Sequence, residues 1–179
     1  MIALPAQADP AELQSDLDVS LERPVTSEQI DRLSHKQNLQ LAIMYLRGEG
    51  REQDVDLAIR LYEAVADRGI AFAHYRLAQI YISGEAFSPD YETGLVWLER
   101  AARLGYVAAQ IDLSKHYQAG EIVSVNLVEA HKWLSIAASL SENEYEYEFE
   151  TLEARMSFVE QVKARYLSRR CMLKGYRDC

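Results

Sequence analysis

The chain has 179 residues, of which 49% are hydrophobic and 26% charged, a balance that is ordinary for one globular domain. Its formal net charge of −9 argues against nucleic acid or an anionic membrane surface as partner, because both need clustered Lys and Arg. No apolar run approaches the ~20 residues that span a bilayer, so we expect no membrane insertion.

The first nine residues contain Ala6-Gln7-Ala8 directly before Asp9, which resembles the cleavage end of a secretory signal peptide. The basic region and most of the apolar region that precede such a site are missing. Residues 1–9 are therefore either a signal-peptide remnant or a disordered terminus. The first alternative predicts a periplasmic or secreted protein, whereas the second is compatible with the cytoplasm.

Residues 10–36 are predicted to form an N-terminal helical cap. A short amphipathic helix is expected over residues 10–21, and Pro24 ends it because proline cannot continue a helix. Thr26 with Gln29 has the spacing of a capping box and predicts the start of a further helix. That helix should lead into the next segment.

Residues 37–141 contain three copies of one pattern at a constant spacing of 36 residues, without a gap. Because the register holds over the whole segment, we interpret it as an internal repeat. The columns in register are Leu41, Leu77 and Leu113; Tyr45, Tyr81 and Tyr117; Gly48, Gly84 and Gly120; Glu49, Glu85 and Glu121; Ala58, Gly94 and Ala130; Leu61, Trp97 and Trp133; and Ala66, Ala102 and Ala138.

Each copy is predicted to fold as two helices. In the second copy Ala73, Leu77 and Ile80 recur at spacings of three and four, which indicates an amphipathic helix. Gly84 is suited to ending this helix in the left-handed conformation. A short polar side chain then stands where the N-cap of the second helix belongs. The three N-cap positions are Asp54, Asp90 and Asn126.

The second helix of the same copy carries small residues that favour close packing. Gly94, Ala101 and Ala102 allow the two helices to approach each other, and Gly105 ends the second helix. A single hairpin of this kind cannot bury its apolar face alone. Three stacked hairpins share a core, which is about the minimum for a stable array.

The combined pattern resembles the Sel-1-like repeat, a relative of the tetratricopeptide repeat. The family's Leu-Gly pair is Leu-Ala or Leu-Ser here, and its second loop glycine survives only as Gly50. The resemblance implies an all-α protein, an α-solenoid of about three 36-residue helix-turn-helix repeats with terminal capping helices. In the second copy the matching residues are Ala73, Leu77, Ala78, Tyr81, Gly84, Asp90, Trp97, Ala101, Ala102 and Gly105.

Residues 142–179 are predicted to form a C-terminal helical cap. Residues 144–150 alternate with period two, which is typical of a strand. A lone strand beside a helical stack has no ladder partner, so we predict a helix instead. Residues 142–153 hold six Glu and residues 163–177 hold six Lys or Arg, which predicts a self-complementary hairpin with a polar outer face.

The two cysteines, Cys171 and Cys179, match no zinc or thioredoxin-type spacing. On one continuous helix they would be about 12 Å apart, too far for a bridge. If Gly175 ends the helix and turns the chain back, the two thiols can form a disulfide; otherwise they remain free. A disulfide would fit a periplasmic or secreted protein.

No motif for catalysis, metal or cofactor binding is apparent. The four histidines stand in no metal-ligand spacing, and neither a Gly-rich phosphate loop nor a Gly-x-Ser-x-Gly elbow occurs. We therefore predict no catalytic residue, no metal and no cofactor. Trp97 and Trp133 stand at core positions of the repeat, which favours packing over ligand stacking.

The first helices of tetratricopeptide-like arrays line a concave surface, and the resemblance transfers that role by register. The corresponding face is largely apolar here, which is typical of an interaction site. Either a peptide or helix of a protein partner occupies this groove, or the chain's own N-terminal helix with Leu13, Leu17 and Val19 does. The predicted lining residues are Lys36, Leu39, Ile43, Leu46, Arg47, Phe72, Tyr75, Gln79, Ile82, Ser83, Ala108, Ile111, Lys115, Gln118 and Ala119.

The leading functional hypothesis is a non-catalytic scaffold or adaptor that binds a protein segment. The family resemblance implies a place in envelope or secretion-associated complexes. One alternative is an immunity protein that neutralises a secreted bacterial toxin such as a phospholipase effector. Another is a β-lactam-binding enzyme, but the chain lacks the within-repeat cysteine pairs of those relatives and a Ser-x-x-Lys motif.

Overall fold

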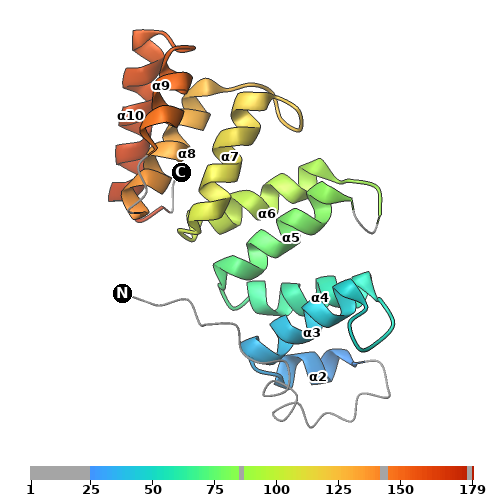
Figure 1. Cartoon of the computed structure of the whole chain (residues 1–179). Coiled ribbons are helices and arrows are strands. Elements are labelled where there is room, and N and C mark those ends of the chain that lie inside the picture. The colour runs from blue at the N-terminus through green and yellow to red at the C-terminus, as the bar shows by residue number, and fades with distance from the viewer. Residues whose placement is uncertain (1–24, 85–86, 142–144, 177–178) are drawn as a thin grey trace. The chain divides into compact units, whose positions relative to one another are not determined.

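A computed structural model describes residues 25–84, 87–141, 145–176 and 179 (Figure 1). Over these residues the chain forms nine helices, α2 to α10, and no strand. It divides into two compact units, Met1–Ala64 and Val65–Cys179, each of which is described on its own. The predictions for residues 1–9 and for a helix over 10–21 lie outside the described residues.

In the described part of the first unit, the first two helices each start in a capping box. Thr26 and Gln29 form the predicted box before α2, and Ser34 and Gln37 form a second one before α3. Asp54 caps α4 as predicted, since its Oδ1 accepts from the Leu57 amide at 2.9 Å. The helices are α2 (Ser27–Arg32), α3 (His35–Arg47) and α4 (Val55–Ala66), the last of which ends inside the second unit.

The second unit stacks its helices in chain order. α5 packs on α6, α6 on α7, and α7 on α8, while α8 also contacts α9 and α10. Such neighbour-to-neighbour packing is the arrangement of an α-solenoid and confirms the predicted fold class. The helices are α5 (Ala71–Ser83), α6 (Tyr91–Arg103), α7 (Val107–Ala119), α8 (Leu127–Leu140), α9 (Glu146–Glu153) and α10 (Phe158–Leu173).

The turn inside each repeat is built the same way. Gly84 ends α5 with φ of 65°, a left-handed conformation that costs glycine no steric strain. The Asp90 amide then donates to the Tyr81 carbonyl at 2.9 Å, and the Asp90 side chain caps α6. Asn126 does the same in the third repeat, where its amide donates to the Tyr117 carbonyl at 2.9 Å. These paired roles explain why glycine and the N-cap residue recur at fixed spacing.

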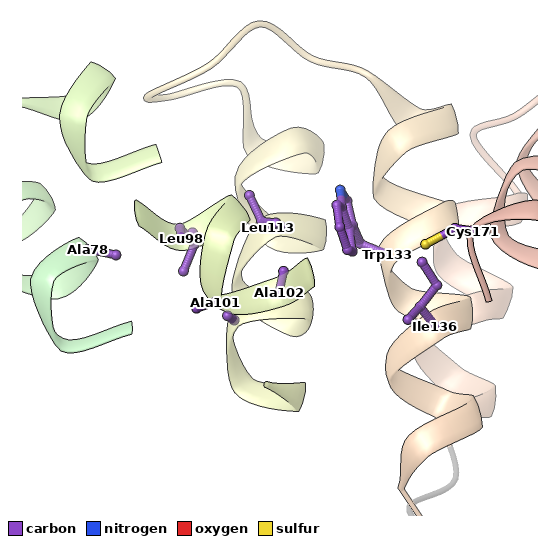
Figure 2. Close-up of a cluster of buried hydrophobic side chains, with 9 residues drawn as sticks. Ala78, Leu98, Ala101, Ala102, Leu113, Trp133, Ile136 and Cys171 are labelled. Atoms are coloured by element: carbon purple, nitrogen blue, oxygen red, sulfur yellow. The ribbon is translucent and has the colours of Figure 1, made fainter. Parts of the chain in front are cut away.

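The core of the second unit joins α5, α6, α7, α8 and α10, and it contains both small and large side chains (Figure 2). Close contact between α5 and α6 depends on Gly94, because a Cβ there would lie 2.5 Å from Cγ1 of Ile82. The predicted role of small residues is thereby confirmed for this pair of helices. The buried cluster comprises Ala78, Leu98, Ala101, Ala102, Ala109, Leu113, Trp133, Ile136 and Cys171.

The C-terminal cap is helical, so the prediction of a helix over the acidic run is confirmed by α9. Leu152 and Met156 pack with side chains of α8 and with Ala164 of α10 in a second buried cluster. Glu153 accepts from Arg165 at 2.8 Å, which pairs the acidic segment with the basic one. The predicted polar outer face is wrong for α10, whose outward side is rich in exposed apolar side chains.

Cys171 and Cys179 form a disulfide, one of the two alternatives that the sequence left open. Gly175 has φ of 59°, so the chain leaves α10 through a left-handed residue. This turn places Cys179 beside the helix. Among the described residues, no helix combines the length and apolar character that a membrane crossing requires.

Candidate functional site

The first helices of the second and third repeats, α5 and α7, each have one side turned away from the core. On α7 the buried side chains are Ala109, Gln110, Leu113 and Ser114. Ile111 and Gln118, on the other side, are half-buried, and Lys115 is exposed. We call this side of α5 and α7 the open face. On α5 it carries the half-buried Phe72, Tyr75 and Gln79 and the exposed Ser83. Tyr75 lies at the edge of this face, because its side chain also packs against the buried cluster.

Aromatic and polar contacts join α5 to α7 along this face. The Tyr75 hydroxyl donates to Asp112 Oδ2 at 2.9 Å, and the Tyr75 ring lies 4.9 Å from the Tyr106 ring. Phe72 contacts Tyr106 edge-on at 6.3 Å between ring centroids. Burial, followed by the bond to Asp112, raises the pKa of Tyr75 to about 12, so its hydroxyl stays a donor at neutral pH. Two successive first helices therefore form one continuous surface.

The two glutamines of the open face are held by local bonds. Gln79 Oε1 accepts from Arg76 at 2.6 Å. The Gln118 side chain donates to Ser114 Oγ at 3.1 Å, and the Gln118 carbonyl accepts from Arg155 at 3.2 Å. These bonds fix the side chains before any partner binds, which lowers the entropic cost of binding.

The first helix of the first repeat, α3, carries the same repeat positions. Lys36 and Arg47 are exposed, and Arg47 pairs with Glu49 at 3.3 Å. Leu39 and Ile43 are half-buried. This side of α3 is therefore apolar in its middle and basic at both ends.

Two of the predicted lining residues point into the fold instead. Leu46 is 8% exposed and belongs to the core. Ile82, one repeat later at the same position, packs over Gly94 of α6. An apolar side chain at this repeat position fills the space between the two helices of its own hairpin. The position of a residue in the repeat therefore does not tell whether its side chain packs inside the hairpin or lies on the open face.

A column of buried polar residues was missed by the sequence analysis. Asn38 and Gln110 donate to the backbone carbonyls eight residues earlier, those of Ile30 and Ala102, each at 3.0 Å. His74, at the same position of the second repeat, bonds the Ala66 carbonyl. Each of these carbonyls lies near the end of the preceding helix and also accepts from the backbone amide three residues later, so the polar side chain adds a second hydrogen bond there. The sequence does contain a signal for this column, namely three polar residues at a spacing of 36 among apolar neighbours. It was not recognised because the three residues are of different types, Asn, His and Gln.

The His74 ring makes this column sensitive to pH. Burial, then the positive charge of Arg100, lowers its pKa below the ordinary 6.5. Below pH 6.5 the unfolded chain takes up a proton that folded His74 refuses, so the free energy of unfolding falls as the pH falls. We expect His74→Gln, which copies Gln110, to flatten this fall. Urea unfolding of both proteins at a series of pH values measures the difference.

The lowered pKa of His116 is present in both proteins and cancels in that comparison. Equal pH profiles for the native protein and His74→Gln would contradict the assignment of the effect to His74.

Ser135, His131 and Glu153 lie together in an order that resembles a hydrolase triad. His131 Nε2 contacts Glu153 Oε1 at 2.8 Å, and Ser135 Oγ lies 3.2 Å from His131 Nδ1. However, the Ser135 hydroxyl donates to the His131 carbonyl at 2.8 Å within one helix, and His131 is 2% exposed. A bond to the helix backbone and a buried imidazole fit a structural role. The hydrogen bonds from Arg165 and from His131 lower the pKa of Glu153, so this carboxylate links α8, α9 and α10.

The repeat boundaries match a known family model. The model for the Sel1 repeat fits residues 38–70, 71–106 and 107–142, which together make up well over half of the chain. The chain belongs to the Sel1 repeat family. Sel1 repeats are protein–protein interaction modules, typically without catalytic activity.

Two solved Sel1 structures are similar to this Sel1 protein. A Sel1 repeat protein from Oxalobacter formigenes has 31% identity and a TM-score of 0.57, covering 71% of this chain and 93% of its own. The protein c5321, a protective antigen present in uropathogenic Escherichia coli strains, has 27% identity and a TM-score of 0.60. That match covers 83% of this chain and 32% of c5321. No curated protein matches the chain.

Proposed function

We propose that this Sel1 protein binds a segment of a partner protein along the open face and serves as a scaffold or adaptor in an envelope or secretion-associated complex. The observation that carries the proposal is the Tyr75–Asp112 bond, with the aromatic contacts around it. It makes a single surface from two repeats, long enough for an extended or helical segment.

The side chains of this surface suit peptide recognition. Phe72, Tyr75 and Ile111 are half-buried, so each leaves part of its apolar side chain open to a partner. Lys115 and Gln79 supply a charge and an amide beside them. A few apolar anchors among polar neighbours are the usual composition of a binding site. Full burial of an exposed side chain contributes about 1.5–3 kcal/mol, and these half-buried side chains contribute part of that value.

The disulfide supports the proposed location. Bridges between cysteines persist in the periplasm and outside the cell but are rare in the cytosol. The Cys171–Cys179 bridge therefore favours an envelope or secreted protein over a cytosolic one.

Site-specific photo-cross-linking in the native host tests the proposal. A photoreactive phenylalanine analogue at Gln79 or Lys115 should yield one shared cross-linked protein. The same analogue at Val96 or Leu104, which are exposed on and just after α6, is the matched control and should yield none. Ile111→Asp in the Lys115-labelled chain should abolish the product while leaving thermal unfolding nearly unchanged.

Cross-links of equal yield from α6 and from the open face would contradict the proposed site. The identity of the captured protein then separates the two roles. An envelope or secretion component supports a scaffold, whereas a secreted toxin supports the alternative role as an immunity protein.

A further inference from the structure

The outward side of α10 carries several strongly exposed apolar side chains. Phe158 is 76% exposed, Tyr166 63% and Leu173 82%. Together with Val162 they stand at spacings of four and seven residues, so they form one stripe along the helix. The opposite side of α10, with Ala164, Ser168 and Cys171, is buried. We call the stripe and the exposed Val159 beside it the outer face.

The outer face is also basic. Arg169 falls in the middle of the stripe, and Arg170 and Lys163 flank it. Glu160 is the one acid within α10, and its carboxylate bonds the N-cap Ser157. An occupant of this face must therefore bring apolar side chains and acidic ones.

Charge argues against two other occupants of the outer face. A second α10 packed on the same stripe would bring Arg169 and its basic neighbours against their own copies, and like charges repel. An anionic membrane suits a basic amphipathic helix, but the whole chain has a net charge of −9, which opposes approach to such a surface.

The chain's own sequence contains the required chemistry. Residues 11–22 hold Leu13, Leu17 and Leu21 at spacings of four, together with four acids and no Lys or Arg. If helical, this sequence has one apolar stripe flanked by carboxylates, which complements the outer face in both respects. Three repeats separate residues 11–22 from α10 along the chain, so joining two copies continues the order of the repeats.

We propose that residues 11–22 of one copy bind the outer face of α10 on a second copy. The contact is head-to-tail, so it leaves one free segment and one free outer face on every dimer. Association should therefore extend beyond the dimer as the concentration rises. This inference concerns a surface separate from the open face and does not depend on the partner proposed for it.

Sedimentation velocity of the full-length chain over a range of concentrations tests the proposal. The native protein should show a mean mass that rises with concentration. Leu13→Asp/Leu17→Asp places charges in the apolar stripe of the segment, and Val162→Asp/Tyr166→Asp places them in the outer face. Each variant should stay monomeric at concentrations at which the native protein associates. Their dissociation constants should rise by at least about tenfold, the effect of losing one well-buried contact. An equimolar mixture of the two variants should form a 1:1 complex, because each contributes the part that the other lacks.

The control is Val96→Asp/Leu104→Asp, which introduces the same charges at exposed positions outside α10 and should associate like the native protein. A native protein that stays monomeric would overturn the proposal, as would a mixture that forms no complex. Association that persists in the α10 variant would assign the contact to another surface. Co-sedimentation of the native protein with phosphatidylserine vesicles, lost in the α10 variant, would assign the outer face to a membrane.

Discussion

Replacing Trp133 by alanine is expected to lower the free energy of unfolding by about 3–5 kcal/mol. Its side chain is 2% exposed and lies in the buried cluster that joins α5, α6, α7, α8 and α10 (Figure 2). The ring also lies under the ammonium of Lys132, 4.6 Å from its centroid. Truncation removes this contact and leaves a cavity in the cluster. Urea unfolding followed by far-ultraviolet circular dichroism measures the loss.

The matched control is Trp97→Ala, which changes the same repeat position one copy earlier. Trp97 is only half-buried, and the guanidinium of the exposed Arg100 lies over its ring, 4.6 Å from the centroid. We expect a clearly smaller loss for this variant. Equal losses of unfolding free energy for the two variants would contradict this expectation. They would mean that the repeat position alone decides the loss and that packing in the cluster with α10 adds nothing for Trp133.

The repeat could be predicted from sequence because its turns depend on local chemistry. Glycine ends α3, α5 and α7, and Asp54, Asp90 and Asn126 cap the helices that follow. These roles need only a left-handed residue and a short acceptor at the right distance, so a period of 36 in the sequence is enough to predict them. The helix α9 could also be predicted, although its sequence alternates like a strand. A single strand beside a stack of helices would have no neighbouring strand to pair with.

The candidate site was less predictable because it depends on which side of each helix meets a neighbour. Ile82 has the spacing of the open face, yet it packs over Gly94, a contact that only the crossing of α5 and α6 determines. The outer face was missed for a similar reason. Phe158, Tyr166 and Leu173 are interrupted by basic residues, and the high charge of the segment suggested a polar surface. The charges flank an apolar stripe, and only the packing of α10 shows that this stripe is exposed.

Replacing Cys171 and Cys179 together by alanine is expected to lower the free energy of unfolding by about 2–4 kcal/mol. The bridge closes a short loop in the unfolded chain and fixes the last residue beside α8. There the Cys179 carbonyl accepts from Lys132 Nζ at 2.9 Å, and Glu129 pairs with the same ammonium. Lys132 is 3% exposed, so losing one of its acceptors leaves a buried charge less well compensated. Alanine is chosen because Cys171 is buried and a serine hydroxyl would need a partner.

A double-mutant cycle with Lys132→Met separates loop closure from this pairing. If the disulfide acts partly by holding the Cys179 carbonyl against the ammonium, the cysteine substitutions should cost less in the Lys132→Met background than in the native one. Dithiothreitol should lower the stability of the native protein by a similar amount and leave the cysteine-free variant unchanged. Strictly additive losses would mean that the bridge acts through loop closure alone, and that the buried lysine is held by Glu129 and Trp133 without it.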